Sequence, residues 1–353
     1  MIRLALIYGG ASSEHSVSCV TALGVYSAID KSKYEVIPIG ITTSGKFVLN
    51  AISPDWKLAD SPKVSDGVEV YPALGGGSWK TALGDDLGVI DIAFPVLHGP
   101  NGEDGSIQGL LQLCDVPYVG NGVLASAVAM EKSKAKALFQ NAGISVAEGL
   151  VITEKEFDLD PEHFLASCRS HFQLPVFVKP SRSGSSVGVS KVKSFDELES
   201  AIVEAFAHDN TVLVETAVVG REVECAVLEL PTGELKVSLA GEIVVTGREF
   251  YDYEAKYLDG GADLLVPTVL TESELGEMHE LAKKAFRALG CSGLARTDFF
   301  LTSSGFVITE VNTMPGFTPI SMYPSLWQAT GVSYPELVDT LIQTGLSQGT
   351  QPR

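Results

Sequence analysis

The segment LARTDFFLTSSGFVITEVN, residues 294–312, has the pattern of two strands joined by a tight turn. Residues near the same end of both strands of a hairpin lie side by side, so Asp298, Glu310 and Asn312 can share one face. Three oxygen ligands without His or Cys suit Mg²⁺, which leaves coordination positions open for phosphate oxygens. The alternative is a solvated sheet face with two acids and an amide, and this segment alone favours neither.

The composition is that of an ordinary globular protein, with 353 residues, of which 45% are hydrophobic and 20% are charged. This length is sufficient for two or three domains and a substantial core. The formal net charge is -19, and Lys and Arg form no cluster. Because nucleic-acid binding needs a basic surface, this balance argues against a nucleic-acid partner. The net charge is still compatible with a small anionic ligand if a few basic residues lie close together in the fold.

The five cysteines are widely spaced and form no CxxC pair. An odd number with this spacing argues against a disulfide scaffold and a zinc site, and indicates a reducing compartment. The apolar run near the N-terminus ends at Gly9-Gly10 and is too short for the core of a signal peptide. No segment approaches the length of a transmembrane helix. We therefore expect a cytoplasmic protein without a membrane partner.

Strands and helices alternate in the first third of the chain. Residues 2–8 predict a buried strand, and a glycine-rich turn and a helix at about 16–29 follow it. Further strands are predicted at 35–41 and 89–95, and residues 50–87 predict an irregular insertion. This alternation predicts an open parallel sheet that binds its ligand at the carboxyl ends of the strands.

A Ser/Gly loop, KPSRSGSSVG at residues 179–188, joins two predicted strands. Small residues let backbone amides approach a polyanion, and Lys179 adds a positive charge at the end of the first strand. The alternative is a flexible hairpin loop without a ligand. The flanking strands and Lys179 favour phosphate binding.

A predicted strand at 211–215 ends at Glu215, and a short linker with Thr216 and Val218 leads to Glu222. Adenine is commonly read by a backbone donor and a backbone acceptor of such a linker. Glu215 can then accept the exocyclic amine, and Glu222 can accept the ribose hydroxyls. The alternative is an edge strand with acidic side chains.

Taken in order, five motifs resemble those of the D-alanine–D-alanine ligase family, whose members have the ATP-grasp arrangement. They are GGASSEHSVS at 9–18, HGPNGEDG at 98–105, the Ser/Gly loop, YDYEAKY at 251–257 and EVNTMPGFT at 310–318. Together they extend over nearly the whole chain, and their length makes a chance match implausible.

The resemblance implies an α+β, three-domain ATP-grasp fold with an N-terminal open parallel α/β domain. Residues 1–130 would form this substrate-binding domain. Residues 131–225 would form the central ATP-grasp subdomain. Residues 226–353 would form the C-terminal subdomain, with the metal hairpin and a mobile loop. In the family the usual assembly is a homodimer.

The implied activity is that of an ATP-dependent carbon–nitrogen ligase. It would join two D-alanines to D-alanyl-D-alanine for peptidoglycan precursor synthesis, and so serve cell-wall biogenesis and cell shape. The first D-alanine would be activated as an acylphosphate, and ADP and phosphate would be released. The implied cofactors are ATP as cosubstrate and two Mg²⁺ ions, which Mn²⁺ can replace.

The resemblance also implies roles for individual residues. The implied catalytic residues are Glu14, Ser185, Tyr257, Arg296 and Gly316. D-alanine would be bound by His98, Ser321 and Met322. ATP would be bound by Lys132, Lys179, Glu215, Thr216, Val218, Glu222 and Lys256. The two metal ions would be held by Asp298, Glu310 and Asn312.

Two other functions stay open from the sequence. A variant ligase could use D-serine or D-lactate as second substrate; Tyr257 argues against D-lactate, because its hydroxyl favours an amine nucleophile. A nucleotide-binding regulatory protein without catalysis is the other alternative. The presence of Arg296, Asp298, Glu310 and Asn312 argues against it.

Overall fold

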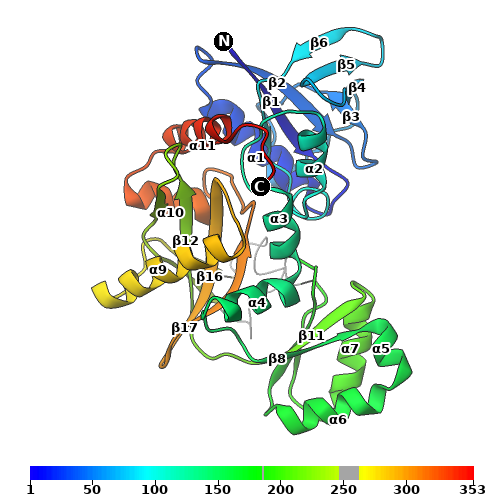
Figure 1. Cartoon of the computed structure of the whole chain (residues 1–353), viewed down its shortest axis with the longest axis vertical. Helices are drawn as coiled ribbons and strands as arrows, with labels where there is room; N and C mark the ends of the chain where they lie inside the picture. The colour runs from blue at the N-terminus through cyan, green and yellow to red at the C-terminus, as the bar shows by residue number, and fades with distance from the viewer. Residues whose placement is uncertain (185–186, 246–261) are drawn as a thin grey trace.

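A computed structural model describes residues 1–184, 187–245 and 262–353 of the chain. The described residues form three β-sheets. Figure 1 shows the N-terminal sheet at the top, the central sheet at the bottom and the C-terminal sheet on the left. The helices α3 (Val123–Met130) and α4 (Lys132–Asn141) connect the N-terminal part to the other two.

The N-terminal sheet has seven strands in the order β6-β5-β4-β3-β2-β1-β7. Its buried strand β1 (Ile2–Gly9) pairs in parallel with β2 (Tyr34–Ile41) and β7 (Ile92–Pro95), as the alternating pattern predicted. Helix α1 (His15–Ala28) joins β1 to β2, and α2 (Ser106–Leu113) follows β7.

The prediction of an irregular insertion over residues 50–87 is wrong, and the sheet is mixed instead of wholly parallel. The antiparallel strands are β3 (Phe47–Leu49), β4 (Val68–Pro72), β5 (Ser78–Thr81) and β6 (Asp86–Val89). Each has at most five residues and at most two buried side chains, such as Val70 and Trp79. Such short strands leave little alternation to detect in the sequence.

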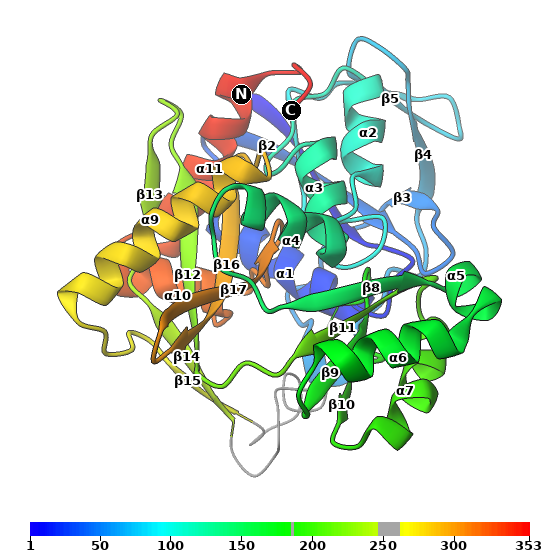
Figure 2. The same ribbon diagram turned by 60° about the horizontal axis from the view of Figure 1, so that its bottom comes forward.

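The central sheet has four strands in the order β10-β9-β11-β8, and its described pairings are antiparallel. The strands are β8 (Gly149–Thr153), β9 (Val176–Pro180), β10 (Ser190–Val192) and β11 (Thr211–Thr216). The helices α5 (Glu154–Leu159), α6 (Pro161–His171) and α7 (Leu198–Phe206), with the short 3-10 helix at Phe195–Glu197, pack against it. They share a separate hydrophobic core, and Figure 2 shows them as a unit at the lower right.

The C-terminal sheet is built around the predicted hairpin, which the structure contains. Its strands are β12 (Arg221–Glu229), β13 (Leu235–Val237), β14 (Gly241–Val245), β15 (Ala262–Leu265), β16 (Leu294–Thr302) and β17 (Gly305–Asn312). Helix α9 (Glu272–Ala288) packs against β12 and the hairpin, and starts with a capping box of Thr271 and Glu274.

The last helices close the core of the first sheet. The apolar side chains of α10 (Met322–Thr330) and α11 (Tyr334–Gln348) share one hydrophobic cluster with Leu4, Leu6 and Leu294. Figure 1 shows α11 beside α1. The Tyr34 hydroxyl also donates a hydrogen bond of 2.7 Å to Asp339 of α11. The domain boundaries after residues 130 and 225 stay predictions.

No helix in the described residues is both long enough and apolar enough to span a bilayer.

Candidate active site

The hairpin brings the three predicted metal ligands together. Asp298 of β16 lies directly opposite Glu310 of β17, and a bulge follows Asp298. The Asn312 side-chain amide donates a hydrogen bond of 2.9 Å to Asp298 Oδ2. Within the described residues, no group of three or more His, Cys, Asp or Glu side chains is placed to hold a metal ion. Two carboxylates and an amide oxygen fit Mg²⁺.

Arg296 is a fixed positive charge beside these ligands. Its guanidinium donates to both oxygens of Asp298, at 2.8 and 2.7 Å, and its Nε lies 3.0 Å from Glu224 Oε2. Burial by itself lowers the pKa of Arg296, but the charges of Asp298 and Glu224 outweigh it and hold the pKa well above its ordinary value. The sequence did not predict a role for Glu224, which lies opposite Asp298 on β12.

The predicted phosphate-binding Lys132 lies between this hairpin and the Ser/Gly loop. Its Nζ donates a hydrogen bond of 2.8 Å to the carbonyl of Ser183 and lies 3.6 Å from Glu310 Oε2. One ammonium group therefore joins the first part of the loop to a predicted metal ligand. A phosphate chain between them would meet positive charge from α4.

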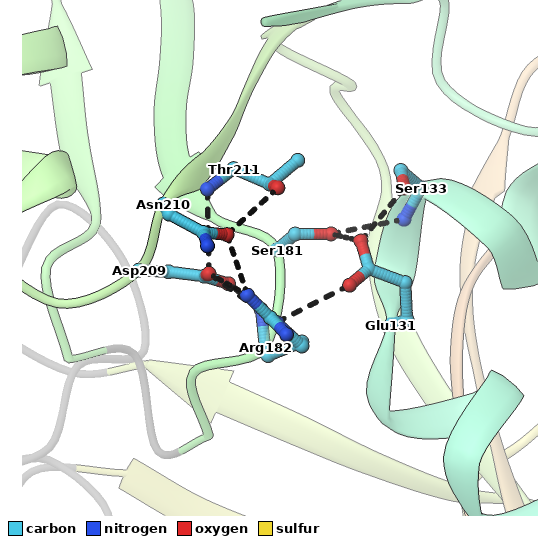
Figure 3. Close-up of polar contacts among 7 residues, drawn as sticks. All are labelled: Glu131, Ser133, Ser181, Arg182, Asp209, Asn210 and Thr211. Atoms are coloured by element: carbon cyan, nitrogen blue, oxygen red, sulfur yellow. Dashed lines mark hydrogen bonds and ion pairs between the residues drawn. The ribbon is translucent and has the colours of Figure 1, made fainter. Parts of the chain in front are cut away.

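A polar cluster fixes the base of the loop on the start of α4 (Figure 3). Glu131 accepts hydrogen bonds from the hydroxyls of Ser133, at 2.7 Å, and Ser181. Its other oxygen lies 3.3 Å from Arg182 Nε, and Arg182 also contacts Asp209 at 2.5 Å. Because these contacts join two separate elements, they fix the loop relative to the lysine at the start of α4.

The predicted nucleotide-binding residue Glu215 is deeply buried at the end of β11. One of its oxygens lies 2.7 Å from Lys136 Nζ, and the other contacts Lys179 Nζ. Burial by itself raises the pKa of Glu215, but the two lysines outweigh it and lower the pKa below its ordinary value. Lys136 is not among the residues predicted from the sequence, although its position four residues after Lys132 places both on one face of a helix.

The linker after Glu215 connects the central and C-terminal sheets. Thr216 is the last residue of β11, and its amide donates to the carbonyl of Glu148 at 2.9 Å. Val218 follows in the linker, and Glu222 lies in β12 opposite Phe300. The predicted adenine and ribose contacts therefore lie where the chain crosses between the two sheets.

His98 is buried three residues after the end of β7, at the predicted carboxyl edge of the first sheet. Its Nε2 lies 3.2 Å from Thr21 Oγ1, and its Nδ1 lies 3.3 Å from the carbonyl of Met314. The Nδ1 atom is also 3.6 Å from Glu103 Oε1. Burial by itself lowers the pKa of His98, but contact with Glu103 outweighs it and raises the pKa. These neighbours orient the imidazole.

Glu14 lies in the turn after β1, beside the same edge. It is at the N-cap position of α1, but its side chain does not cap the helix. A Cβ atom built at Gly99 would lie only 2.8 Å from Glu14 Oε2, so the carboxylate lies against the residue that follows His98. The structure thus brings Glu14 and His98 together.

The C-terminal signature forms the start of α10. Ser321 is at its N-cap position, and its Oγ accepts a hydrogen bond of 3.1 Å from the Thr318 amide. A Cβ atom built at Gly316 would lie 3.3 Å from this oxygen. Met322 is the first residue of the helix, where backbone amides favour an anion. Three further predicted residues, Ser185, Lys256 and Tyr257, lie outside the described residues.

Known proteins match this chain over nearly its whole length. The family model described as D-ala D-ala ligase N-terminus matches residues 3–121, and that described as D-ala D-ala ligase C-terminus matches residues 138–343. A D-alanine–D-alanine ligase of Mycolicibacterium vanbaalenii is 49% identical over 99% of this chain and 98% of its own length. The chain belongs to the D-alanine–D-alanine ligase family. The corresponding protein of Streptomyces griseus is 48% identical, over 99% of this chain and 93% of its own.

Solved structures of the D-alanine–D-alanine ligase family have the same fold. The VanG D-Ala:D-Ser ligase of Enterococcus faecalis has a TM-score of 0.85 and 36% identity, over 98% of this chain and 99% of its own. The D-alanine–D-alanine ligase of Coxiella burnetii has a TM-score of 0.82 and 32% identity, over 99% and 96%. The predicted family and its α+β ATP-grasp fold are confirmed.

Proposed function

We propose that this member of the D-alanine–D-alanine ligase family uses ATP to join two D-alanines for peptidoglycan precursor synthesis. The observation that carries the proposal is the junction of Arg296, Asp298 and Glu310 with Lys132. There a guanidinium contacts a carboxylate at 2.7 Å, the two carboxylates lie opposite each other, and an ammonium group lies 3.6 Å from the second carboxylate. These contacts support roles in metal and phosphate binding. Family membership supports the same activity.

In the first step, the carboxylate of one D-alanine attacks the γ-phosphorus of ATP, and the bond to the β–γ bridging oxygen breaks. The products are an acylphosphate and ADP. Glu14 binds the ammonium group of this D-alanine, and His98 lies beside its carboxylate. Lys132 and Lys179 neutralise the phosphates. Asp298, Glu310 and Asn312 would hold two Mg²⁺ ions, which supply charge neutralisation to the phosphate oxygens when bound.

In the second step, the neutral amine of the other D-alanine attacks the acyl carbon. Ser321 and the backbone amide of Met322 bind the carboxylate of this second amino acid. The tetrahedral oxyanion is stabilised by Arg296 and by the amide of Gly316, since fixed donors at a developing charge lower the barrier. The amine then loses a proton, the C–O bond to phosphate breaks, and the dipeptide forms.

Glu215, Thr216, Val218 and Glu222 bind the adenosine part of ATP in this proposal. Lys256 and Tyr257 are proposed to complete the phosphate site and the group around Glu14, together with Ser185. The use of Mn²⁺, a homodimer and a cytoplasmic location stay predictions.

A ligase with D-serine as second substrate is the second candidate, because the similar VanG protein is a D-Ala:D-Ser ligase. Phosphate release from Mg-ATP with D-alanine, L-alanine, D-serine or D-lactate, with mass detection of the products, separates the candidates. D-Ala-D-Ala from D-alanine alone is the expected result. A mixed D-Ala-D-Ser product, when both amino acids are present, would favour the second candidate. Absence of amino-acid-dependent phosphate release would contradict both.

A further inference from the structure

A second lysine lies on the inner face of α4, one turn after Lys132. The side chain of Lys136 is 9% exposed, and its Nζ lies 2.7 Å from Glu215 Oε1. The Glu215 side chain is 3% exposed and contacts Lys179 through its other oxygen. A carboxylate at this depth is therefore held between two ammonium groups, one on each oxygen.

The two lysines differ in their surroundings. Lys179 is 20% exposed, and it is the first residue of the Ser/Gly loop, one residue before the end of β9. Lys136 comes from the middle of α4, among the buried residues Ala135 and Phe139. Lys179 is thus the more exposed of the two lysines, and the proposed function assigns it to a phosphate group, whereas the surroundings of Lys136 keep it with the carboxylate. Burial lowers the pKa of Lys136, and the charge of Glu215 opposes this.

Burial of a carboxylate without a cation is costly, and such a group takes up a proton instead. A protonated Glu215 would become a hydrogen-bond donor at one oxygen. An ionised Glu215 can only accept, and the exocyclic 6-amine of adenine is a donor, whereas the 6-oxo group of hypoxanthine is an acceptor. The charge state and orientation of Glu215 therefore decide which purine suits the site.

We propose that Lys136 is a positioning residue that determines nucleotide specificity. It keeps Glu215 ionised and directed as an acceptor when Lys179 turns to the phosphates, so that ATP is preferred to a 6-oxo purine nucleotide. The inference rests on the proposed role of Glu215 in binding adenine.

The test is the ratio of kcat/KM for ATP to kcat/KM for ITP in full-length Lys136→Met. We expect this ratio to fall by about tenfold or more. A site that accepts a hydrogen bond from the 6-amine of adenine no longer discriminates against a 6-oxo purine when Glu215 is not held as an ionised acceptor. The loss should appear as a higher KM for ATP, with kcat at saturating ATP changed less than about threefold. Lys136→Arg, which retains the charge, should recover most of the ratio.

Lys134→Met is the matched control, because Lys134 is exposed on the same helix. It should leave the ratio unchanged. Lys136→Gln removes the charge but keeps a hydrogen-bond donor, and it replaces Lys136→Met if the latter does not fold. An unchanged ratio in a folded Lys136→Gln or Lys136→Met protein, or an equal loss of kcat with both nucleotides, would overturn the proposal.

Glu215→Ala separates this inference from the proposed function. If Glu215→Ala lowers the ATP-to-ITP ratio and Lys136→Met does not, Glu215 reads the base but Lys136 has no part in specificity. If Glu215→Ala leaves the ratio unchanged, the proposed adenine contact of Glu215 is wrong, and the inference about Lys136 is wrong with it.

Discussion

At the scale of single residues, burial determines which charges are permanent. Arg296 is held by Asp298 and Glu224, and its side chain is 19% exposed. A guanidinium in this position cannot lose its proton, so it can supply the constant positive potential that its proposed role at an oxyanion needs. The same surroundings make it costly to remove, because its acidic partners would be left without a cation.

Arg296→Ala should leave nucleotide binding largely intact and lower the rate of dipeptide formation by about 100-fold or more, because it removes a preorganised donor from the transition state. Steady-state phosphate release and equilibrium nucleotide binding measure the two effects. Arg287→Ala is the control, since Arg287 is exposed on α9. A ligation rate within a few-fold of the parent enzyme would remove Arg296 from the mechanism.

At the scale of elements, local sequence predicts those parts of the site that lie within one motif. The hairpin of β16 and β17 follows from its apolar strands and its turn. Local sequence does not predict the contacts of Lys136, Glu224 and Glu131, because each contact joins elements that are far apart in the sequence. The pattern of neighbouring residues carries no information on contacts between distant elements.

The capping box of α9 makes the stability of the protein dependent on pH in a defined direction. Hydrogen bonds from the Thr271 backbone and hydroxyl lower the pKa of Glu274 below its ordinary value of 4.5. A carboxyl whose pKa is lowered on folding stabilises the protein above its unfolded pKa, and this contribution is lost as the pH falls through the folded pKa.

Glu274→Gln should therefore lower the free energy of unfolding at pH 7, and the difference from the parent protein should shrink below about pH 4.5. Urea denaturation across this pH range measures it. Glu277→Gln is the matched control, because Glu277 is exposed on the same helix and lies outside the capping box. A difference that stays constant with pH would show that the Glu274 charge does not contribute.

At the scale of the whole molecule, a buried amide joins the N-terminal and C-terminal parts. Asn121 donates to the carbonyls of Leu294 and Thr313, at 2.7 and 2.8 Å, and accepts from the Ser292 amide at 2.9 Å. Thr313 directly follows a predicted metal ligand. This one side chain therefore holds the end of the first part of the chain against the hairpin.

Asn121→Ala should destabilise the protein by about 2–4 kcal/mol, because three buried backbone groups lose their hydrogen bonds to this side chain. Chemical denaturation measures the loss. Asn141→Ala, at an exposed position at the end of α4, should have an effect near zero. Equal stability of the two variants would mean that the contacts of Asn121 contribute little to the junction.

Helix α11 covers part of the hydrophobic core of the N-terminal sheet, and this has a consequence for biosynthesis. Tyr34 and its partner Asp339 are 305 residues apart in the chain. At a ribosomal rate of ~5–20 residues per second, roughly 15 to 60 s separate their appearance. During that interval the nascent first sheet has an uncovered apolar face. We therefore expect chains truncated before α11 to be captured by chaperones or to aggregate, even though they contain the complete first sheet.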